Sequence, residues 1–476
     1  MTADATSARS GARAALGLFI VGLGTLTAPL DSSVNIAFPA ITRAFGVPLE
    51  DMQWVVICYV LIYSSLTLVF GKMGDLVGHR RIFGIGLFVS AIAFAFCGAA
   101  DTFVELLLAR ALQGVGSALV ISCGPALATM LFAESFRARA LGIYTMAFGL
   151  GGVIGPSLGG VLIEEWGWSA VFWFRAPLAA VTLMLLFLLP RAQPRAGSRS
   201  FDIAGAALLV VGLSTFLLAI NQARHVGAGE PVVPVLLGFA AVGCFAGFFW
   251  QQRRSPEPIL HPKWFRNAAF TVVNVTNVMV NMVGFAVMFL VPFYLDRMTD
   301  LSLVTAGAVL AMSPAGMVLA GPVGGWLLGR VAAPRLAFAG AVLVGLGLLA
   351  IGQWGATTSI VVMVAGLATV GIGFGFFQVA YMEIVAAILP LRERGVAGSL
   401  AMVTRTIGVV SGATGLALAF TGFTPVGAGT TGADFLAPFA TTLTAAGALL
   451  LVFLAVTLLR PRIWFAAAWR SSDSSH

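Results

Sequence analysis

One acidic residue stands inside the first long apolar stretch of the chain, in the sequence TAPLDSSVNIAFPAI (residues 27–41). Two basic residues, Arg110 and Arg175, stand inside later apolar stretches. Ionisable side chains within such segments are costly to bury and usually serve a function. Burial and a neighbouring positive charge act on the proton affinity of a carboxylate in opposite directions, so such a group can exchange protons. Asp31 is therefore the first candidate for proton chemistry.

The three charged side chains are expected at similar depths. With a rise of about 1.5 Å per residue, Asp31 lies roughly 16 Å from the outer end of its predicted helix, and Arg110 and Arg175 each lie roughly 10 Å from theirs. We therefore expect them to share one aqueous cavity, with Asp31 and Arg110 coupling protons. The alternative is a static Asp31–Arg110 ion pair that only holds two helices together.

Other polar and aromatic residues recur at helical spacing inside apolar stretches. Thr27, Asp31, Asn35 and Phe38 follow the spacing i, i+4, i+8 and i+11, which predicts one polar stripe on a single helix. The residues expected to line a substrate cavity are Asn35, Tyr59, Tyr63, Gln113, Arg175, Asn274, Asn277, Asn281, Gln378, Tyr381 and Arg405.

Several of these candidates have a purely structural alternative. The asparagines at 274, 277 and 281 form a face that must meet protein or cavity rather than lipid, so hydrogen bonding between helices would also explain them. The tyrosines fit a flat amphipathic ligand, but aromatic stripes also serve packing. Glu383 is a further proton-coupling candidate, although its position near a helix end lets it reach interfacial water.

The elements that carry these residues are membrane-spanning helices. Of the 476 residues, 59% are hydrophobic and 10% are charged, and the mean hydropathy is +0.98. A soluble domain is about one quarter charged. A helix that crosses the hydrocarbon core needs roughly 20 apolar residues. The apolar runs are too long and too uniform for the alternating strands of a membrane β-barrel. The chain is thus predicted to be an all-α integral membrane protein.

Fourteen helices are expected. Their predicted ranges are 15–42, 52–71, 82–100, 103–132, 139–163, 169–189, 202–221, 232–250, 268–295, 301–328, 335–353, 359–388, 395–421 and 435–459.

The placement of positive charge gives the predicted orientation. Most of the 27 Lys and Arg fall in the two tails and in alternate loops, which by the positive-inside rule puts both termini in the cytoplasm. The net charge of +8 therefore follows topology and does not indicate nucleic acid. The expected location is the cytoplasmic (inner) membrane of a bacterium, where the chain makes multiple passes as a monomer.

No residue pattern indicates a cofactor, a metal site or a catalytic centre. The four cysteines all lie within predicted helices, and the four histidines are scattered without an H-E-x-x-H pattern or a nucleophile elbow. No Walker-type phosphate loop is present in the sequence, so ATP is not the expected energy source. We therefore predict neither an enzyme nor a cofactor, and a receptor would lack a sizeable soluble domain.

Two segments resemble each other across the chain. FRARALGIYTMAFG (136–149) aligns with LRERGVAGSLAMVT (391–404), which suggests two duplicated six-helix bundles with two helices inserted between them. Repeats of this kind recur in secondary transporters. The predicted domains are 1–190, an N-terminal six-helix bundle; 191–266, two linker helices with their loops; and 267–476, a C-terminal six-helix bundle with a short tail.

Two glycine-rich stretches carry ordered motifs. GKMGDLVGHRR (71–81) is predicted as a cytoplasmic loop, with Gly71 and Gly78 for tight turning and Asp75, Arg80 and Arg81 as charges. In GLGGVIGPSLGGVL (149–162), a nearly bare helix surface allows close helix approach, with a kink expected at proline. The residues concerned are Gly149, Gly155, Pro156, Gly159 and Gly160. Plain packing is the alternative for the second stretch.

These stretches resemble motifs of the major facilitator superfamily. GKMGDLVGHRR resembles its loop signature, and ARALQGVGSAL (109–119) its fourth-helix motif with an intramembrane arginine. The glycine-rich stretch 149–162 resembles the fifth-helix motif of proton-coupled exporters, and LDSSVNIAFP (30–39) the first-helix motif of drug:proton antiporters. Together with fourteen predicted helices, the resemblance is to the fourteen-helix drug:proton antiporter family and covers essentially the whole chain.

The resemblance implies a major facilitator fold and proton-coupled export of small amphipathic compounds by alternating access. A narrow-substrate carrier, or an importer of a metabolite or vitamin, is the second reading. Two positions depart from the family pattern: Gly325 replaces an expected aspartate, and Arg175 stands where an uncharged polar residue is more usual. Arg175 would suit an anionic or carboxylate-bearing substrate.

Overall fold

The computed structural model describes residues 15–130, 137–188, 202–223, 232–254, 267–388, 394–423 and 432–465. Regular secondary structure in these ranges is helical throughout, so the predicted all-α class is confirmed for them. Each of the fourteen predicted ranges overlaps at least one helix of the structure. Nine helices in the described ranges are long and apolar enough to cross a membrane, and fourteen crossings remain a prediction.

The chain divides into two compact units. The first comprises Met1–Pro48 and Trp54–Phe201, and the second comprises Leu49–Gln53 and Asp202–His476. The predicted domain boundaries at 190–191 and 266 fall in segments outside the described residues, as do both tails. The division into three domains therefore stays a prediction.

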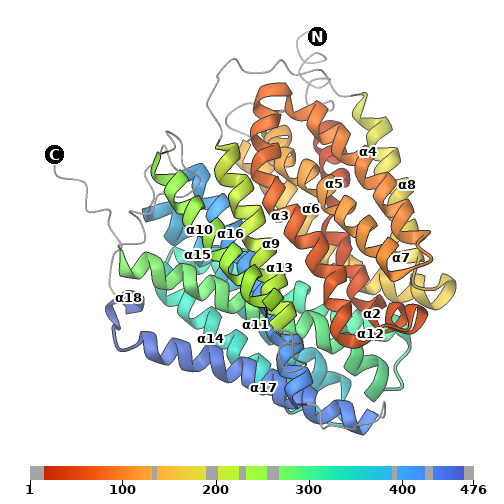
Figure 1. Cartoon of the computed structure of the whole chain (residues 1–476), viewed down its shortest axis with the longest axis vertical. Coiled ribbons are helices and arrows are strands. Elements are labelled where there is room, and N and C mark those ends of the chain that lie inside the picture. Colours follow the sequence, from red (N-terminus) through yellow and green to blue (C-terminus); the bar gives the residue numbers. More distant parts are fainter. Residues whose placement is uncertain are drawn as a thin grey trace, which may run out of the picture. The chain divides into compact units, whose positions relative to one another are not determined.

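The first unit contains the Asp31 segment and the helices around it. Its elements are η1 (Pro29–Ser32), α2 (Ser33–Phe45), α3 (Leu49–Val77) from Trp54 onward, α4 (His79–Gly98), α5 (Phe103–Met130), α6 (Arg137–Trp166), α7 (Ala170–Trp173) and α8 (Arg175–Leu186) (Figure 1).

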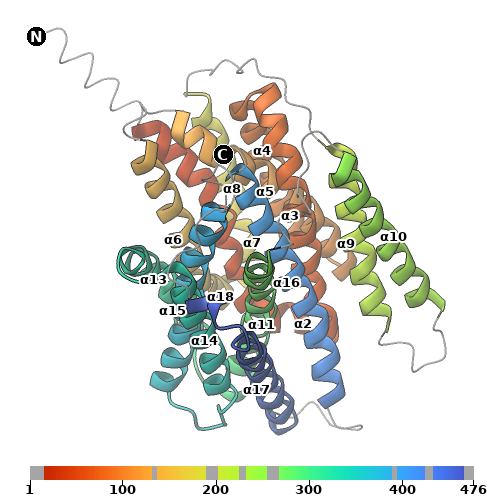
Figure 2. The same cartoon turned by 90° about the vertical axis from the view of Figure 1, so that its left-hand side faces the viewer.

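The second unit follows the same all-helical plan. Its elements are α9 (Ile203–Ala223), α10 (Val232–Arg254), α11 (Ala268–Met298), α12 (Leu303–Leu310), α13 (Met312–Leu328), α14 (Ala333–Ile351), α15 (Ile360–Ile388), α16 (Arg394–Phe423), α17 (Gly432–Thr457) and α18 (Arg462–Phe465). Within it, α14 packs against both α15 and α17 (Figure 2).

The first predicted helix is not continuous. A helix begins at Ala15, and the backbone then tightens into the 3₁₀ segment η1, where the Asp31 N–H donates to Ala28 O at 3.0 Å. Pro29 is the reason, because proline has no N–H for an α-helical hydrogen bond and its ring clashes with the preceding turn. The helix is therefore interrupted along the predicted polar stripe. Thr27, which opens it, is buried and donates to its own neighbour Gly24 O at 2.6 Å.

A second break in a predicted helix determines the position of Arg175. The range 169–189, predicted as one helix, is divided between α7 and α8, and Arg175 is the first residue of α8. The range 301–328 is likewise divided between α12 and α13.

The glycine-rich face of α6 packs against the segment that carries Asp31. A Cβ built on Gly151 would lie 2.6 Å from Pro29 Cγ, and a Cβ on Gly155 would clash with the Ser32 hydroxyl. Ser32 also donates across this contact to Gly152 O at 3.2 Å. Such close approach is available only to helices without side chains on that face. The glycines of α6 therefore fix the position of η1, and Gly159, Gly160 and Pro156 are buried along the same helix.

Candidate functional site

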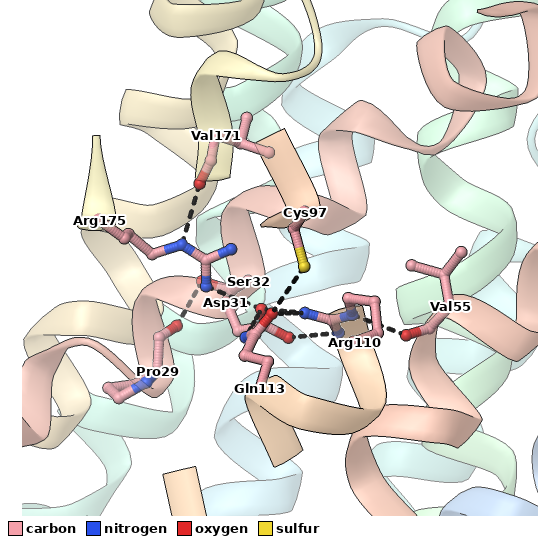
Figure 3. A network of polar contacts seen from close by, with 9 residues as sticks. All are labelled: Pro29, Asp31, Ser32, Val55, Cys97, Arg110, Gln113, Val171 and Arg175. Atoms are coloured by element: carbon pink, nitrogen blue, oxygen red, sulfur yellow. Dashed lines mark hydrogen bonds and ion pairs between the residues drawn. The ribbon is translucent and has the colours of Figure 1, made fainter. Parts of the chain in front are cut away.

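Asp31 lies at the centre of a charged cluster within the first unit. Its two carboxylate oxygens accept hydrogen bonds from Arg110, at 2.6 Å from Nη1 and 2.8 Å from Nη2 (Figure 3). Arg175 Nη1 donates to Oδ1 at 2.8 Å. The cluster thus joins η1, α5 and α8, and the structure brings together the three charges that the sequence placed at similar depth.

Arg110 is fixed by further contacts on every side. Its Nε donates to Val55 O at 2.9 Å, and its Nη1 donates to Gln113 Oε1 at 2.7 Å. Gln113, one turn further along α5, donates in return to Asp31 Oδ1 at 2.8 Å. The guanidinium also lies 4.5 Å above the ring of Tyr59. A two-point carboxylate pair with these additional donors is a rigid arrangement.

Arg175 is held less completely. Its Nε donates to Val171 O at 2.9 Å, and its guanidinium lies 4.5 Å from the centre of the Phe94 ring and 5.3 Å from that of Phe172. Its Nη2 is buried and has no hydrogen-bond partner among the described residues. One donor of this arginine is therefore available to an acceptor that a ligand could supply.

The cluster is buried and carries more positive than negative charge. Arg110 and Arg175 are 1% and 0% exposed, and Asp31 is 14% exposed. Two guanidinium groups and one carboxylate sum to a charge of about +1. Burying uncompensated charge is costly, so the arrangement favours an additional anion or a change in protonation.

Two aromatic candidates lie beside the cluster. Tyr59 and Tyr63 on α3 are nearly buried and stack with their ring centres 5.8 Å apart and an interplanar angle of 8°. Asn35 on α2 is half-buried. Cys97 Sγ lies 3.8 Å from Gln113 Oε1 and can donate only a weak hydrogen bond. Within the described residues, no group of three or more potential metal ligands occurs.

The asparagine face of α11 forms a separate, uncharged network in the second unit. Tyr381 on α15 donates to Asn274 Oδ1 at 2.8 Å, and Asn277 Nδ2 donates to Thr404 Oγ1 on α16 at 2.7 Å. Asn281 Nδ2 donates to Asn277 O at 2.8 Å. All five side chains are buried. In this structure the amides are engaged in bonds within and between helices, which was the alternative to cavity lining, and the cavity role stays a prediction.

The remaining candidates of the second unit take no part in these hydrogen bonds. Glu383 on α15 and Arg405 on α16 are exposed, and Gln378 is half-buried. Thr404, next to Arg405, is the buried partner that the sequence reasoning missed. Its signal was weak, because one threonine in an apolar helix often only bonds to its own backbone, as Thr404 also does to Leu400 O at 2.7 Å.

The sequence model of the Major Facilitator Superfamily matches residues 14–413. The chain belongs to the Major Facilitator Superfamily.

Relatives within the superfamily differ in their cargo. The riboflavin transporter RibZ of Clostridioides difficile is 28% identical over 397 residues, which cover 83% of this chain and 86% of the relative. The multidrug resistance protein Stp of Mycobacterium tuberculosis (strain CDC 1551 / Oshkosh) is 30% identical over 398 residues, covering 83% and 73%.

Solved structures of superfamily transporters have the same fold. The crystal structure of peptide transporter POT in complex with sulfate matches with a TM-score of 0.70 over 94% of this chain and 95% of that chain, at 18% sequence identity. The major facilitator fold expected from the motifs is thereby confirmed.

The superfamily loop signature lies mostly in helices. Residues 71–81 were predicted as a loop, but α3 continues to Val77 and α4 begins at His79. Only Gly78 between them adopts a φ of +106°, which side-chain-bearing residues rarely reach. The loop prediction is wrong because a single glycine makes the whole turn. Gly71 and Asp75 thus belong to α3, and Arg80 and Arg81 to the first turn of α4.

Proposed function

We propose that this superfamily member is a proton-coupled secondary transporter that exports small amphipathic compounds by alternating access. The observation that carries the proposal is the Asp31 carboxylate, which is shared by Arg110 and Arg175 and enclosed by helices. Protonation of Asp31 would remove the only negative charge of this cluster and release both guanidinium groups. Such a group couples proton binding to a rearrangement of η1, α5 and α8.

The same cluster supports a charge preference for the cargo. With a net charge of about +1 and an unpartnered Arg175 Nη2, it favours a substrate that carries a carboxylate or another anionic group. Tyr59 and Tyr63 would offer flat apolar faces beside it. Asn35 and Gln113 would complete the substrate-binding surface of the first unit. For the second unit, we propose substrate contacts by the amide network and Arg405 separately.

We further propose that the protein transports its cargo outward and belongs to the fourteen-helix drug:proton antiporter family. Both proposals are supported by the motifs at 30–39 and 149–162 and by similarity to a multidrug resistance protein. We further propose the cytoplasmic membrane of a bacterium as the location, with both termini inside.

The second candidate function is import of one metabolite or vitamin. The similarity to a riboflavin transporter over 83% of this chain favours it, since that relative is about as similar as the resistance protein. A narrow carrier and a multidrug exporter can share fold and coupling residues, because specificity depends on the few side chains that touch the substrate.

Transport into inside-out membrane vesicles tests the proposal. An imposed proton gradient, acid inside, should drive accumulation of several members of a dye and antibiotic panel that includes anionic and cationic pairs. Vesicles without the protein are the control. No gradient-dependent accumulation of any compound would contradict export. Uptake of labelled riboflavin into whole cells, with no panel compound moved, would support the importer instead.

A further inference from the structure

A groove on the first unit lies away from the charged cluster, between α4 and α8. Its volume is about 600 Å³. Figure 1 shows these two helices side by side. The residues that line it are Val77, Gly78, Arg80, Arg81, Gly84, Ile85, Phe88, Leu183, Leu186 and Phe187. The groove is thus polar only around its two arginines and the turn at Gly78.

The polar end of the groove is built to attract an anion. Arg80 donates from Nε and Nη2 to Leu186 O at 3.3 and 3.1 Å, and so is anchored on the last turn of α8. Arg81 is exposed. Both residues stand in the first turn of α4, a 20-residue helix whose N-terminus adds partial positive charge. Two guanidinium groups and a helix N-terminus therefore converge at this end.

The rest of the groove is apolar and open. Ile85 and Phe88 follow Arg81 along α4, and both are exposed, as is Phe187 at the end of α8. Gly84 lets α4 and α8 approach closely at the floor of the groove, because a Cβ there would lie 3.1 Å from Leu186 Cδ2 and 3.7 Å from Leu183 Cδ1. From Arg81 to Phe88 the helix rises about 10 Å. The cationic end of the groove thus continues into an apolar strip suited to a hydrocarbon chain.

We propose that this groove binds an anionic phospholipid, with the phosphate at Arg81 and the N-terminus of α4. One acyl chain lies over Gly84 against Ile85 and Phe88. The arginine end is on the predicted cytoplasmic side, where anionic lipids are abundant and basic pockets between helices recruit their headgroups. A protein partner would have to cover apolar side chains at membrane depth, so a lipid is the occupant that matches both ends.

Thermal unfolding of the purified full chain in neutral detergent tests this inference without any knowledge of the cargo. Phosphatidylglycerol, phosphatidylcholine and glycerol phosphate are titrated in parallel. Phosphatidylglycerol should raise the unfolding temperature by several degrees, since a ligand of the folded state stabilises it. Phosphatidylcholine and glycerol phosphate should have at most a small effect. Equal stabilisation by phosphatidylcholine would refute the anionic site, and equal stabilisation by glycerol phosphate would refute the lipid as occupant.

Two variants locate the site. Arg81→Gln removes the exposed charge, and Gly84→Leu fills the floor of the groove. Each should weaken the apparent affinity for phosphatidylglycerol at least tenfold. Their matched controls are Arg43→Gln, another exposed arginine, and Gly243→Leu on α10, where nothing lies within 4 Å of a Cβ. Unchanged affinity in both groove variants, or an equal loss in the controls, would overturn the assignment.

A measurement on the wild-type protein covers the case in which a variant misfolds. Native mass spectrometry of protein extracted from mixed phosphatidylglycerol and phosphatidylcholine bilayers should retain one phosphatidylglycerol in preference to phosphatidylcholine. Retention in proportion to the bilayer composition would count against the site. Because lipid retention is read directly, its failure would leave the proposed transport function untouched.

Discussion

The two compact units both bury polar side chains beside a close helix contact, but the polar groups differ in kind. In the first unit, α6 presses its glycines against η1, and the enclosed groups are one carboxylate and two guanidinium groups. In the second unit, a Cβ on Gly408 of α16 would lie 2.5 Å from Val278 O on α11, and the enclosed groups nearby are amides and hydroxyls.

This difference separates two uses of a buried polar group. Amides and hydroxyls stay uncharged across the physiological pH range. The network of the second unit can therefore join helices but cannot respond to protons. A carboxylate between arginines changes the charge of its surroundings when it binds a proton. We therefore expect the proton response from the first unit and helix cohesion from the second.

The largest effect is expected from Asp31→Asn. The amide cannot take up a proton, so transport driven by a proton gradient should fall to the level of protein-free vesicles. The change also leaves two buried arginines without a counter-charge, at a cost of about 3–5 kcal/mol. Gradient-driven and counterflow transport should be measured on equal amounts of folded protein. Full gradient-driven activity in Asp31→Asn would erase the distinction between the units.

The unfolding temperatures of variants at Asp31 and Arg175 should reveal the excess positive charge of this cluster. The double variant Asp31→Asn with Arg175→Met removes one charge of each sign. Its unfolding temperature should recover part of the loss seen in Asp31→Asn alone, because the two residues are in direct contact and their effects are not additive. A fully additive double variant would mean that the Arg175 contact contributes no coupling.

The next effect concerns the glycine contact that positions Asp31. Gly155→Leu would drive a side chain into Ser32 and into Leu30 O, which a Cβ already approaches to 3.3 Å. Overpacking of this kind costs about 1–3 kcal/mol and would displace η1. Gly415→Leu is the matched control, since nothing lies within 4 Å of a Cβ there. Gly155→Leu should unfold at a lower temperature than Gly415→Leu. Equal stability of the two variants would show that α6 does not hold η1 in place.

The two arginines should differ in their contribution to stability. Arg110→Met removes both bonds to Asp31, the bond to Val55 O and the contact with Gln113, for a loss of about 2 kcal/mol. Arg175→Met leaves Asp31 paired with Arg110 and relieves the excess charge, so its cost should stay below about 1 kcal/mol. Equilibrium denaturation in detergent measures both. The reverse order would contradict the description of Arg175 as the less completely held cation.

The smallest effect is expected in the second unit. Tyr381→Phe removes one donor to Asn274 Oδ1, and such a bond between membrane helices contributes about 0.6 kcal/mol. The pH dependence of transport should stay as in the wild type, since no charge is altered. A shifted pH profile in Tyr381→Phe would transfer part of the proton response to the second unit.

Much of the fold could be read from the sequence, because hydrophobic length is a direct consequence of the bilayer. The predicted helix ranges and the juxtaposition of Asp31 with Arg110 and Arg175 both follow from counting residues along apolar runs. The break at η1 was signalled by Pro29, but a proline does not always interrupt a helix, since α5 and α6 continue through Pro125 and Pro156.

Side-chain partners were harder to predict than helix positions. Rotation of each helix about its axis decides whether a residue meets protein, and apolar runs contain little information on rotation. Arg405 attracted attention as a charge within a predicted helix, yet it is exposed, while the neighbouring Thr404 is buried against Asn277. The amide face of α11 was predicted to line a cavity, and in this structure its amides bond within α11 and to side chains of α15 and α16.

The two-to-one ratio of guanidinium groups to carboxylates in the first unit has an electrical consequence. The three side chains sum to about +1 with Asp31 ionised and to about +2 with Asp31 protonated. Moving one elementary charge through 100 mV takes about 2.3 kcal/mol. Any step that shifts this cluster through the membrane field is therefore voltage-dependent, and the protonated form feels twice the force of the ionised one. An interior-negative potential would favour the state in which the cluster faces the cytoplasm.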